Sequence, residues 1–209
     1  VKSNYEKYSQ VRSTSGKTGR EVAEEILHAN GIYDVDVVKG EGFLTDHYDP
    51  NKKVVCLSPA NFDRPSVAGT AIAAHEVGHA IQHQQGYAFL RFRTALVPLA
   101  NIGSSLSYII IMAGIFLTAL GSAFGSTALW IGAGLMSLAV LFSIVTLPVE
   151  FDASSRAMKQ ITALNIVNEK EYKHARKVLS AAAMTYVAAT ATAVAELVRI
   201  ILLARASDN

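Results

Sequence analysis

The sequence predicts a mainly α-helical membrane protein with a smaller polar portion of mixed α and β structure. Three observations support this class. The chain of 209 residues is 51% hydrophobic, residues 94–149 contain no charged side chain, and the charged residues gather in 1–93 and 150–177. A helix needs about 20 apolar residues to cross a hydrocarbon core of about 30 Å, so the uncharged block is long enough to belong in lipid.

The polar portion, residues 1–93, is expected to hold the α+β structure. Thr18 and Glu21 form a capping-box pattern ahead of an amphipathic helix that stops at Gly31. β-branched residues alternate with breakers up to residue 58, which predicts two or three short strands with a turn at 49–53. A further helix is expected over 66–86, after Pro65.

The uncharged block predicts a transmembrane helical hairpin over 94–149. Its apolar stretches, 95–121 and 128–149, are each long enough to span a bilayer, and the uncharged link between them is short. Both ends of the hairpin therefore return to the same side. Basic residues flank these ends and are missing from the tip, which indicates that the polar segments face the cytoplasm.

The remaining chain predicts a cytosolic helical segment over 150–177 and a third membrane helix over 178–205. Asn168 and Glu171 fit an N-cap pair at the start of the last helix. Glu196 and Arg199 lie one helical turn apart within the third apolar stretch and are expected to pair. The alternative is a long amphipathic helix packed on the hairpin.

Composition excludes some classes of protein. The net charge of +2 and the absence of a basic stripe with interleaved aromatics argue against a nucleic-acid partner. Cys56 is the single cysteine, so the chain has no intrachain disulfide and suits a reducing compartment.

The stretch HEVGH, residues 75–79, predicts a zinc site. His75 and His79 lie on one face of a helix and can direct both imidazoles at one cation. Glu76 lies close enough to act as general base, accepting a proton from a zinc-activated water and passing it to the leaving amine. Such a short pattern also arises by chance, but its uncharged neighbours favour a helix buried behind an active site.

The third zinc ligand must come from elsewhere in the chain. His83 would lie about 12 Å along the helix from His75, too far to share its metal. The metzincin pattern is excluded, because Gln82 and Gln85 stand where it requires glycine and histidine. Glu150 is the first acidic residue after the hairpin, at the membrane boundary, where a charge needs a partner. The alternative for Glu150 is a solvated glutamate at a helix start.

Five segments closely resemble the YugP-like family of membrane neutral zinc metallopeptidases, over nearly the whole chain: YEKYSQVRSTSGKTG, LTDHYDP, AAHEVGHAIQH, ALVPLANIGSS and LPVEFDASSRA. More distantly, the order of zinc helix, hairpin and glutamate is similar to the HtpX and CAAX prenyl protease superfamily. This resemblance implies a zincin-like α+β portion, Zn²⁺ as cofactor, and Glu150 as the third ligand beside His75 and His79. It also implies a membrane helix upstream of residue 1.

The sequence departs from the wider superfamily at Ser154, where an aspartate normally braces a zinc histidine. Ligand histidines generally need such a brace. Asp152, Asp46 and Asp49 are the candidates to supply it.

The stretch LTDHYDP, residues 44–50, is a second functional candidate. His47 and Tyr48 could donate hydrogen bonds to the oxyanion formed during amide hydrolysis. The alternative is that Asp46, Asp49 and Pro50 simply shape a turn. The strand VVCLS, residues 54–58, is hypothesised to offer its edge to an extended peptide.

Together these features predict an integral membrane zinc endopeptidase, with Glu76 and His47 as catalytic residues and a peptide or protein as substrate. It is expected in the cell membrane as a multi-pass protein, with its site facing the cytoplasm. It could act as a homo-oligomer or within a membrane protein complex. The alternative function is a membrane scaffold with a structural zinc site, closed by a fourth ligand such as His47 or Asp46. A small transporter is disfavoured, because no paired broken helices are evident.

Overall fold

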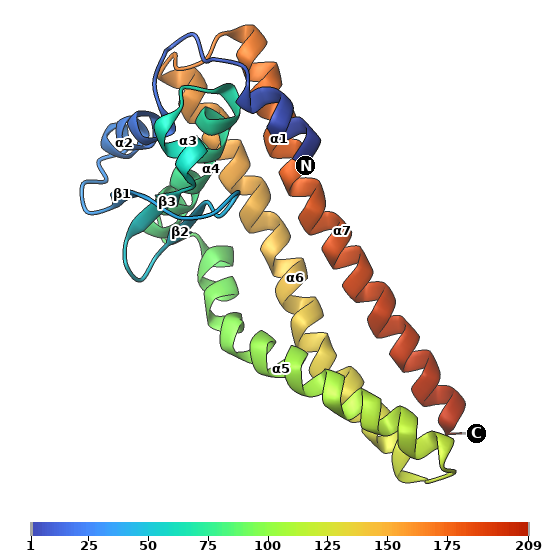
Figure 1. Ribbon diagram of the computed structural model, residues 1–209. Coiled ribbons are helices and arrows are strands. Elements are labelled where there is room, and N and C mark those ends of the chain that lie inside the picture. The colour runs from blue at the N-terminus through green and yellow to red at the C-terminus, as the bar shows by residue number, and fades with distance from the viewer. Residues whose placement is uncertain (1, 209) are drawn as a thin grey trace. The chain divides into compact units, whose positions relative to one another are not determined.

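A computed structural model describes residues 2–208 (Figure 1). Its chain forms seven helices and three short strands among these residues, so the prediction of a mainly α protein with a small sheet is confirmed. The elements in order are α1 (Lys2–Ser9), α2 (Gly19–Ala29), β1 (Asp36–Lys39), β2 (His47–Asp49), β3 (Val54–Leu57), α3 (Pro59–Asp63), α4 (Val67–Gln84), α5 (Ala88–Ala119), α6 (Phe124–Ala163) and α7 (Glu169–Ser207).

The chain divides into two compact units. The first unit contains the residues up to Leu90 together with Val149–Thr185. The second contains Arg91–Pro148 and the residues from Tyr186 onward. The sheet and α1–α4 therefore belong to the first unit, whereas α6 and α7 each contribute to both.

The sheet of the first unit has the order β1-β3-β2. β1 pairs with β3 in parallel, with Val37 opposite Val55, and β2 pairs with β3 in antiparallel, with Tyr48 opposite Val55. The hypothesis that the VVCLS strand offers an edge to a peptide is therefore wrong. That segment is β3, and both of its edges are already hydrogen-bonded to neighbouring strands. Free edges of this sheet belong to β1 and β2.

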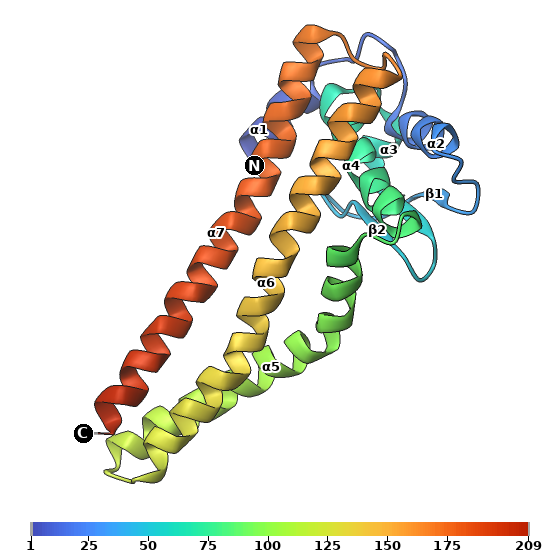
Figure 2. The ribbon, with the colours of Figure 1, turned by 180° about the vertical axis from the view of Figure 1, so that it is seen from behind.

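Helix α4 lies at the centre of the hydrophobic core of the first unit. Its Val77 and Ile81 are buried against Ile26 of α2, Leu57 of β3 and Ile161 of α6. Figures 1 and 2 both show α4 beside the last turns of α6. Small residues allow this close packing, since seven of the 18 residues of α4 are alanine or glycine.

Local signals in the sequence fix the ends of these helices. The predicted capping box is present at α2, where the Thr18 side chain accepts from the backbone N–H of Glu21 and Glu21 bonds back to the Thr18 N–H. The Asn168 and Glu171 pair caps α7 in the same reciprocal way. Both predictions are confirmed, because capping depends on residues close together in the chain.

Three helices, α5, α6 and α7, are long and apolar enough to cross a membrane. The predicted stretches 128–149 and 178–205 fall within α6 and α7, and the stretch 95–121 runs two residues past the end of α5. In the second unit, α5 and α6 approach closely at glycines: a Cβ added to Gly132 would lie near the side chain of Ile111, and one added to Gly103 would meet the backbone of Leu135. Small residues commonly permit such contacts between membrane helices. Glu196 and Arg199 pair on α7 as expected.

Candidate metal centre

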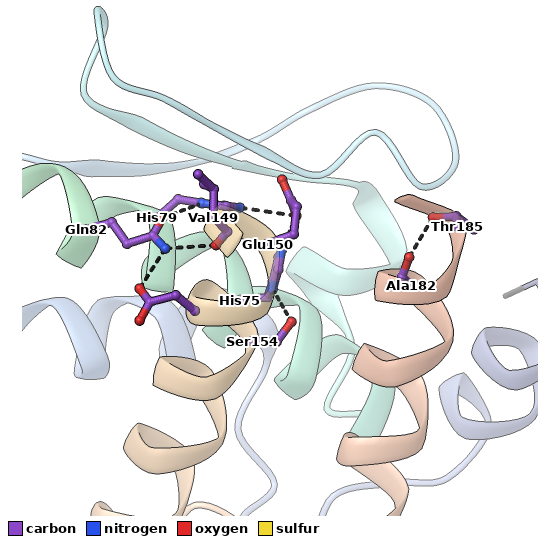
Figure 3. A network of polar contacts seen from close by, with 9 residues as sticks. His75, His79, Gln82, Val149, Glu150, Ser154, Ala182 and Thr185 are labelled. Atoms are coloured by element: carbon purple, nitrogen blue, oxygen red, sulfur yellow. Dashed lines mark hydrogen bonds and ion pairs between the residues drawn. The ribbon is translucent and has the colours of Figure 1, made fainter. Parts of the chain in front are cut away.

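His75, His79 and Glu150 lie together in the first unit. One ligand atom from each lies within 4.8 Å of the others. The Oε2 atom of Glu150 is 3.2 Å from Nε2 of His75 and 3.6 Å from Nε2 of His79. Figure 3 shows the two imidazoles on α4 and the carboxylate that α6 brings to them. Residues 75 positions apart in the sequence thus converge on one point.

These three side chains fit a zinc ion by their chemistry and spacing. Imidazole nitrogen and carboxylate oxygen are ordinary zinc ligands. Two ligand atoms at 2.0–2.1 Å from a tetrahedral metal are roughly 3.4 Å apart, and the observed separations of 3.2 and 3.6 Å lie on either side of that spacing.

Burial makes the negative charge of this cluster energetically unfavourable unless a cation is bound. Glu150 is 3% exposed and His79 is 8% exposed. A carboxylate so far from water requires compensation by opposite charge and hydrogen bonds. Burial alone would lower the pKa of His79, but the hydrogen bond and charge of Glu150, together with the charge of Glu76, raise it overall. The site is therefore electrostatically suited to positive charge.

Glu76 lies beside the cluster and is also buried, at 8% exposure. Burial raises the pKa of its carboxyl above the usual range, while the neighbouring His75 and His79 act in the opposite direction. In the described part of the chain its side chain has no hydrogen-bond partner. A carboxylate kept unpaired in a buried site is free to exchange protons with a substrate or with water.

Each histidine is oriented by a second polar side chain. Nδ1 of His79 lies 3.0 Å from Oε1 of Gln82, and Nδ1 of His75 lies 3.1 Å from Oγ of Ser154. If both oxygens accept from Nδ1–H, each Nε2 carries its lone pair toward Glu150 and the metal position. This tautomer is the one that a zinc ligand requires.

Gln82 is itself held by a chain of hydrogen bonds between α4 and α6. Its Nε2 donates to the backbone oxygen of Val149 and to Oδ2 of Asp152, both at 2.8 Å. Arg156 in turn donates to Asp152 through Nε and to Gln85 through a terminal guanidinium nitrogen. The amide of Gln82 therefore cannot rotate freely, and its oxygen stays directed at His79 (Figure 3).

Gln82 and Ser154 are not among the braces predicted from the sequence, which were Asp152, Asp46 and Asp49. Of these three, Asp152 acts only indirectly, through Gln82. Asp46 accepts hydrogen bonds from Ser58 and Asn61, and Asp49 accepts from the turn backbone after it. One signal for Gln82 was available, because it follows His79 by three residues and so shares its helix face.

Gly78 allows the two ligand-bearing helices to approach. A Cβ atom at this position would lie 2.6 Å from the backbone oxygen of Ala153 and 3.2 Å from its Cα. Any larger residue would push α6 away from α4. The glycine within HEVGH thus sets the distance that brings Glu150 to the two histidines.

His47 and Tyr48 occupy β2, which packs against α4. Nδ1 of His47 lies 2.8 Å from the backbone oxygen of Thr45, and its side chain is exposed. The hydroxyl of Tyr48 lies 2.8 Å from Nδ1 of His83. Burial raises the pKa of Tyr48 to about 12, so this hydroxyl keeps its proton, and the tautomer of His83 decides which of the two groups donates the hydrogen bond. His83 is not part of the metal cluster, as its helical position predicted.

A largely buried His-His-Glu cluster, together with three helices in residues 2–208 that are long and apolar enough to cross a membrane, points to a metal-binding membrane protein. A family model described as "Putative neutral zinc metallopeptidase" matches residues 1–205, and the chain belongs to that family. The resemblance seen in the sequence is thereby confirmed, and zinc is the cofactor that goes with the family.

One curated relative is "Putative membrane protease YugP" of Bacillus subtilis (strain 168). It is 44% identical over 203 residues, which cover 97% of this chain and 88% of the relative. No solved structure matches the chain.

Proposed function

We propose that this protein is an integral membrane zinc endopeptidase. The observation that carries the proposal is the convergence of ligand atoms from His75, His79 and Glu150 within 4.8 Å. Membership of a zinc metallopeptidase family and similarity to a protein named as a membrane protease support the same reaction class.

The number of ligands favours a catalytic site over the alternative structural one. Structural zinc is usually held by four protein ligands, whereas catalytic zinc is held by three and leaves one position open. In the described part of the chain the cluster has three members. Asp46 is engaged by Ser58 and Asn61, and His47 by Thr45, so neither proposed fourth ligand closes the site.

The metal ligands and Glu76 have separate roles in the proposed reaction. Zinc held by His75, His79 and Glu150 would act as a Lewis acid toward water and the substrate carbonyl. Glu76 accepts the proton of the attacking water and then donates it to the departing amine. Its burial strengthens this role, because a raised pKa makes the carboxylate a better proton acceptor near neutral pH.

The substrate is a peptide or protein segment that reaches the metal centre. In this proposal, β2 offers a free edge of the sheet to the extended chain of the substrate. His47, on the same strand, supplies a hydrogen bond to the developing oxyanion once the peptide is bound.

The proposed location is the cell membrane, in a multi-pass arrangement. The hairpin of 94–149 and the helix of 178–205 cross the bilayer, and 1–93 with 150–177 form the catalytic portion on the cytoplasmic side. This orientation is supported by Arg91 and Arg93 before the hairpin and by the basic residues after it. Assembly as a homo-oligomer or in a larger membrane complex is compatible with this arrangement.

Glu76→Gln tests the proposed reaction. The variant in reconstituted vesicles should bind zinc in the same ratio as the unaltered protein and should lose peptide hydrolysis by several orders of magnitude. Glu24→Gln, on the outward side of α2 with a side chain 38% exposed, is the matched control and should retain activity. Hydrolysis that survives in Glu76→Gln would refute the assigned role of this carboxylate.

A further inference from the structure

A groove lies between the last turns of α6 and the first turns of α7, within the first unit. Its volume is about 960 Å³, and much of its lining is apolar, including Met158, Leu179 and Met184. Phe151 and Met184 are 47% and 58% exposed, so the groove opens beside large apolar side chains. The metal ligands do not line it, and it is therefore a separate feature of the unit.

The groove carries positive charge that no acidic residue balances. Lys159 and Arg176 line it, and among its described lining residues none is acidic. Neither cation forms an ion pair anywhere in residues 2–208. Hydroxyl groups of Ser155, Tyr172 and Ser180 lie in the same lining. The arrangement leaves two cations and several donors facing an open groove, which is complementary to an anionic ligand.

The lining of the groove changes from apolar to cationic along the helices α6 and α7. Phe151 lies two residues after the end of the apolar stretch 128–149, and Met184 lies within the apolar stretch 178–204. Lys159 and Arg176 lie nearer the connection between α6 and α7 at 164–168. One end of the groove is thus apolar and continues into sequence that suits lipid, while the other end is cationic.

We propose that this groove binds an anionic phospholipid of the surrounding bilayer. The phosphate group pairs with Lys159 and Arg176, and an acyl chain runs over Met158 and Leu179 toward Met184. A phospholipid has the same order of anionic head and apolar tail as the groove, and a basic residue at a membrane surface attracts anionic lipid. The proposal depends on α6 and α7 spanning the membrane and not on peptidase activity.

The groove also touches the metal centre through one shared residue. Ser154 lines the groove, and its Oγ lies 3.1 Å from Nδ1 of His75. A lipid in the groove therefore contacts a side chain that orients a metal ligand. Through this contact, the lipid composition of the bilayer influences the metal site.

Native mass spectrometry of the full chain in detergent tests the proposal, with phosphatidylglycerol and phosphatidylcholine as the probes. The unaltered protein should retain phosphatidylglycerol in preference to phosphatidylcholine. Lys159→Gln with Arg176→Gln should weaken phosphatidylglycerol binding by at least about tenfold. Ser180→Trp, which fills the groove without changing charge, should also reduce the lipid retained.

Lys170→Gln with Lys173→Gln is the matched control, because these lysines lie on α7, as Arg176 does, but do not line the groove. The control should keep the lipid preference. Equal losses in the control and groove variants would overturn the proposal, as would unchanged binding in both groove variants. Displacement of the lipid by inorganic phosphate alone would also contradict it, since the acyl chain would then contribute nothing.

Discussion

Gly78 on α4 lies against the backbone of Ala153 on α6, with no room for a side chain between them. A Cβ at residue 78 would lie 2.6 Å from the Ala153 oxygen. Gly78→Ala should therefore separate the helices and lower zinc affinity by at least about tenfold, as displaced ligands usually do. Competitive chelator titration measures this affinity. Gly134→Ala is the control, because a Cβ there meets nothing within 4 Å, and equal losses in both variants would contradict this explanation.

The amide of Gln82 should be required for tight zinc binding. Gln82→Leu removes the acceptor for His79 and leaves Asp152 with Arg156 as its remaining donor. Loss of a group that orients a ligand typically lowers metal affinity by about 10- to 100-fold. The control Gln84→Leu changes an exposed position of the same helix and should bind zinc normally.

A paired exchange distinguishes bracing from simple packing at Gln82. Gln82→Glu alone should weaken zinc binding, because the introduced carboxylate on α4 then faces the carboxylate of Asp152 on α6. Adding Asp152→Asn should restore binding, since the introduced amide can donate to the glutamate, which still accepts from His79. Absence of rescue, in a double variant that folds, would argue against the hydrogen-bond chain.

Ser154 should be a weaker brace than an aspartate would be at the same position. A serine hydroxyl makes a neutral hydrogen bond to His75, whereas a carboxylate makes a charge-assisted one of about twice the strength. Ser154→Asp should therefore tighten zinc binding, and Ser154→Ala should weaken it. The neighbouring exposed Ser155→Asp adds the same charge away from His75 and serves as control in isothermal titration calorimetry.

Zinc should stabilise the first unit through Glu150. Metal that binds only the folded state raises stability in proportion to the logarithm of its free concentration. Chelation should therefore lower the melting temperature of the unaltered protein, measured by the fluorescence of a solubilised sample. The Glu150→Gln variant should show little further change on chelation. A large chelator effect in that variant would mean that the ion binds elsewhere.

Features set by neighbouring residues could be predicted from the sequence. The caps at Thr18 and Asn168, the helix around His75 and His79, and the apolar helices all follow from short-range patterns. Glu150 could also be predicted, because the expected hairpin would return the chain to the side of the membrane from which it left. The proposed oxyanion role of His47 stays a prediction.

Other features depend on contacts between distant parts of the chain, and these the sequence did not reveal. β3 is the central strand because it pairs with β1, although β2 lies between these two strands in the sequence. The contact of Ser154 with His75, and the hydrogen bonds from Gln82 to Val149 and Asp152, depend on the packing of α4 against α6. No periodicity or spacing in the sequence indicates which polar side chains meet across a contact between two helices.

The division of the first unit into two separate stretches of chain limits how the protein can be shortened. One stretch ends at Leu90 and supplies both imidazoles, and the other begins at Val149 and supplies the carboxylate. Cutting the chain before its apolar hairpin would discard one member of the metal cluster. A water-soluble version for biochemical work would have to splice the two stretches with an artificial linker.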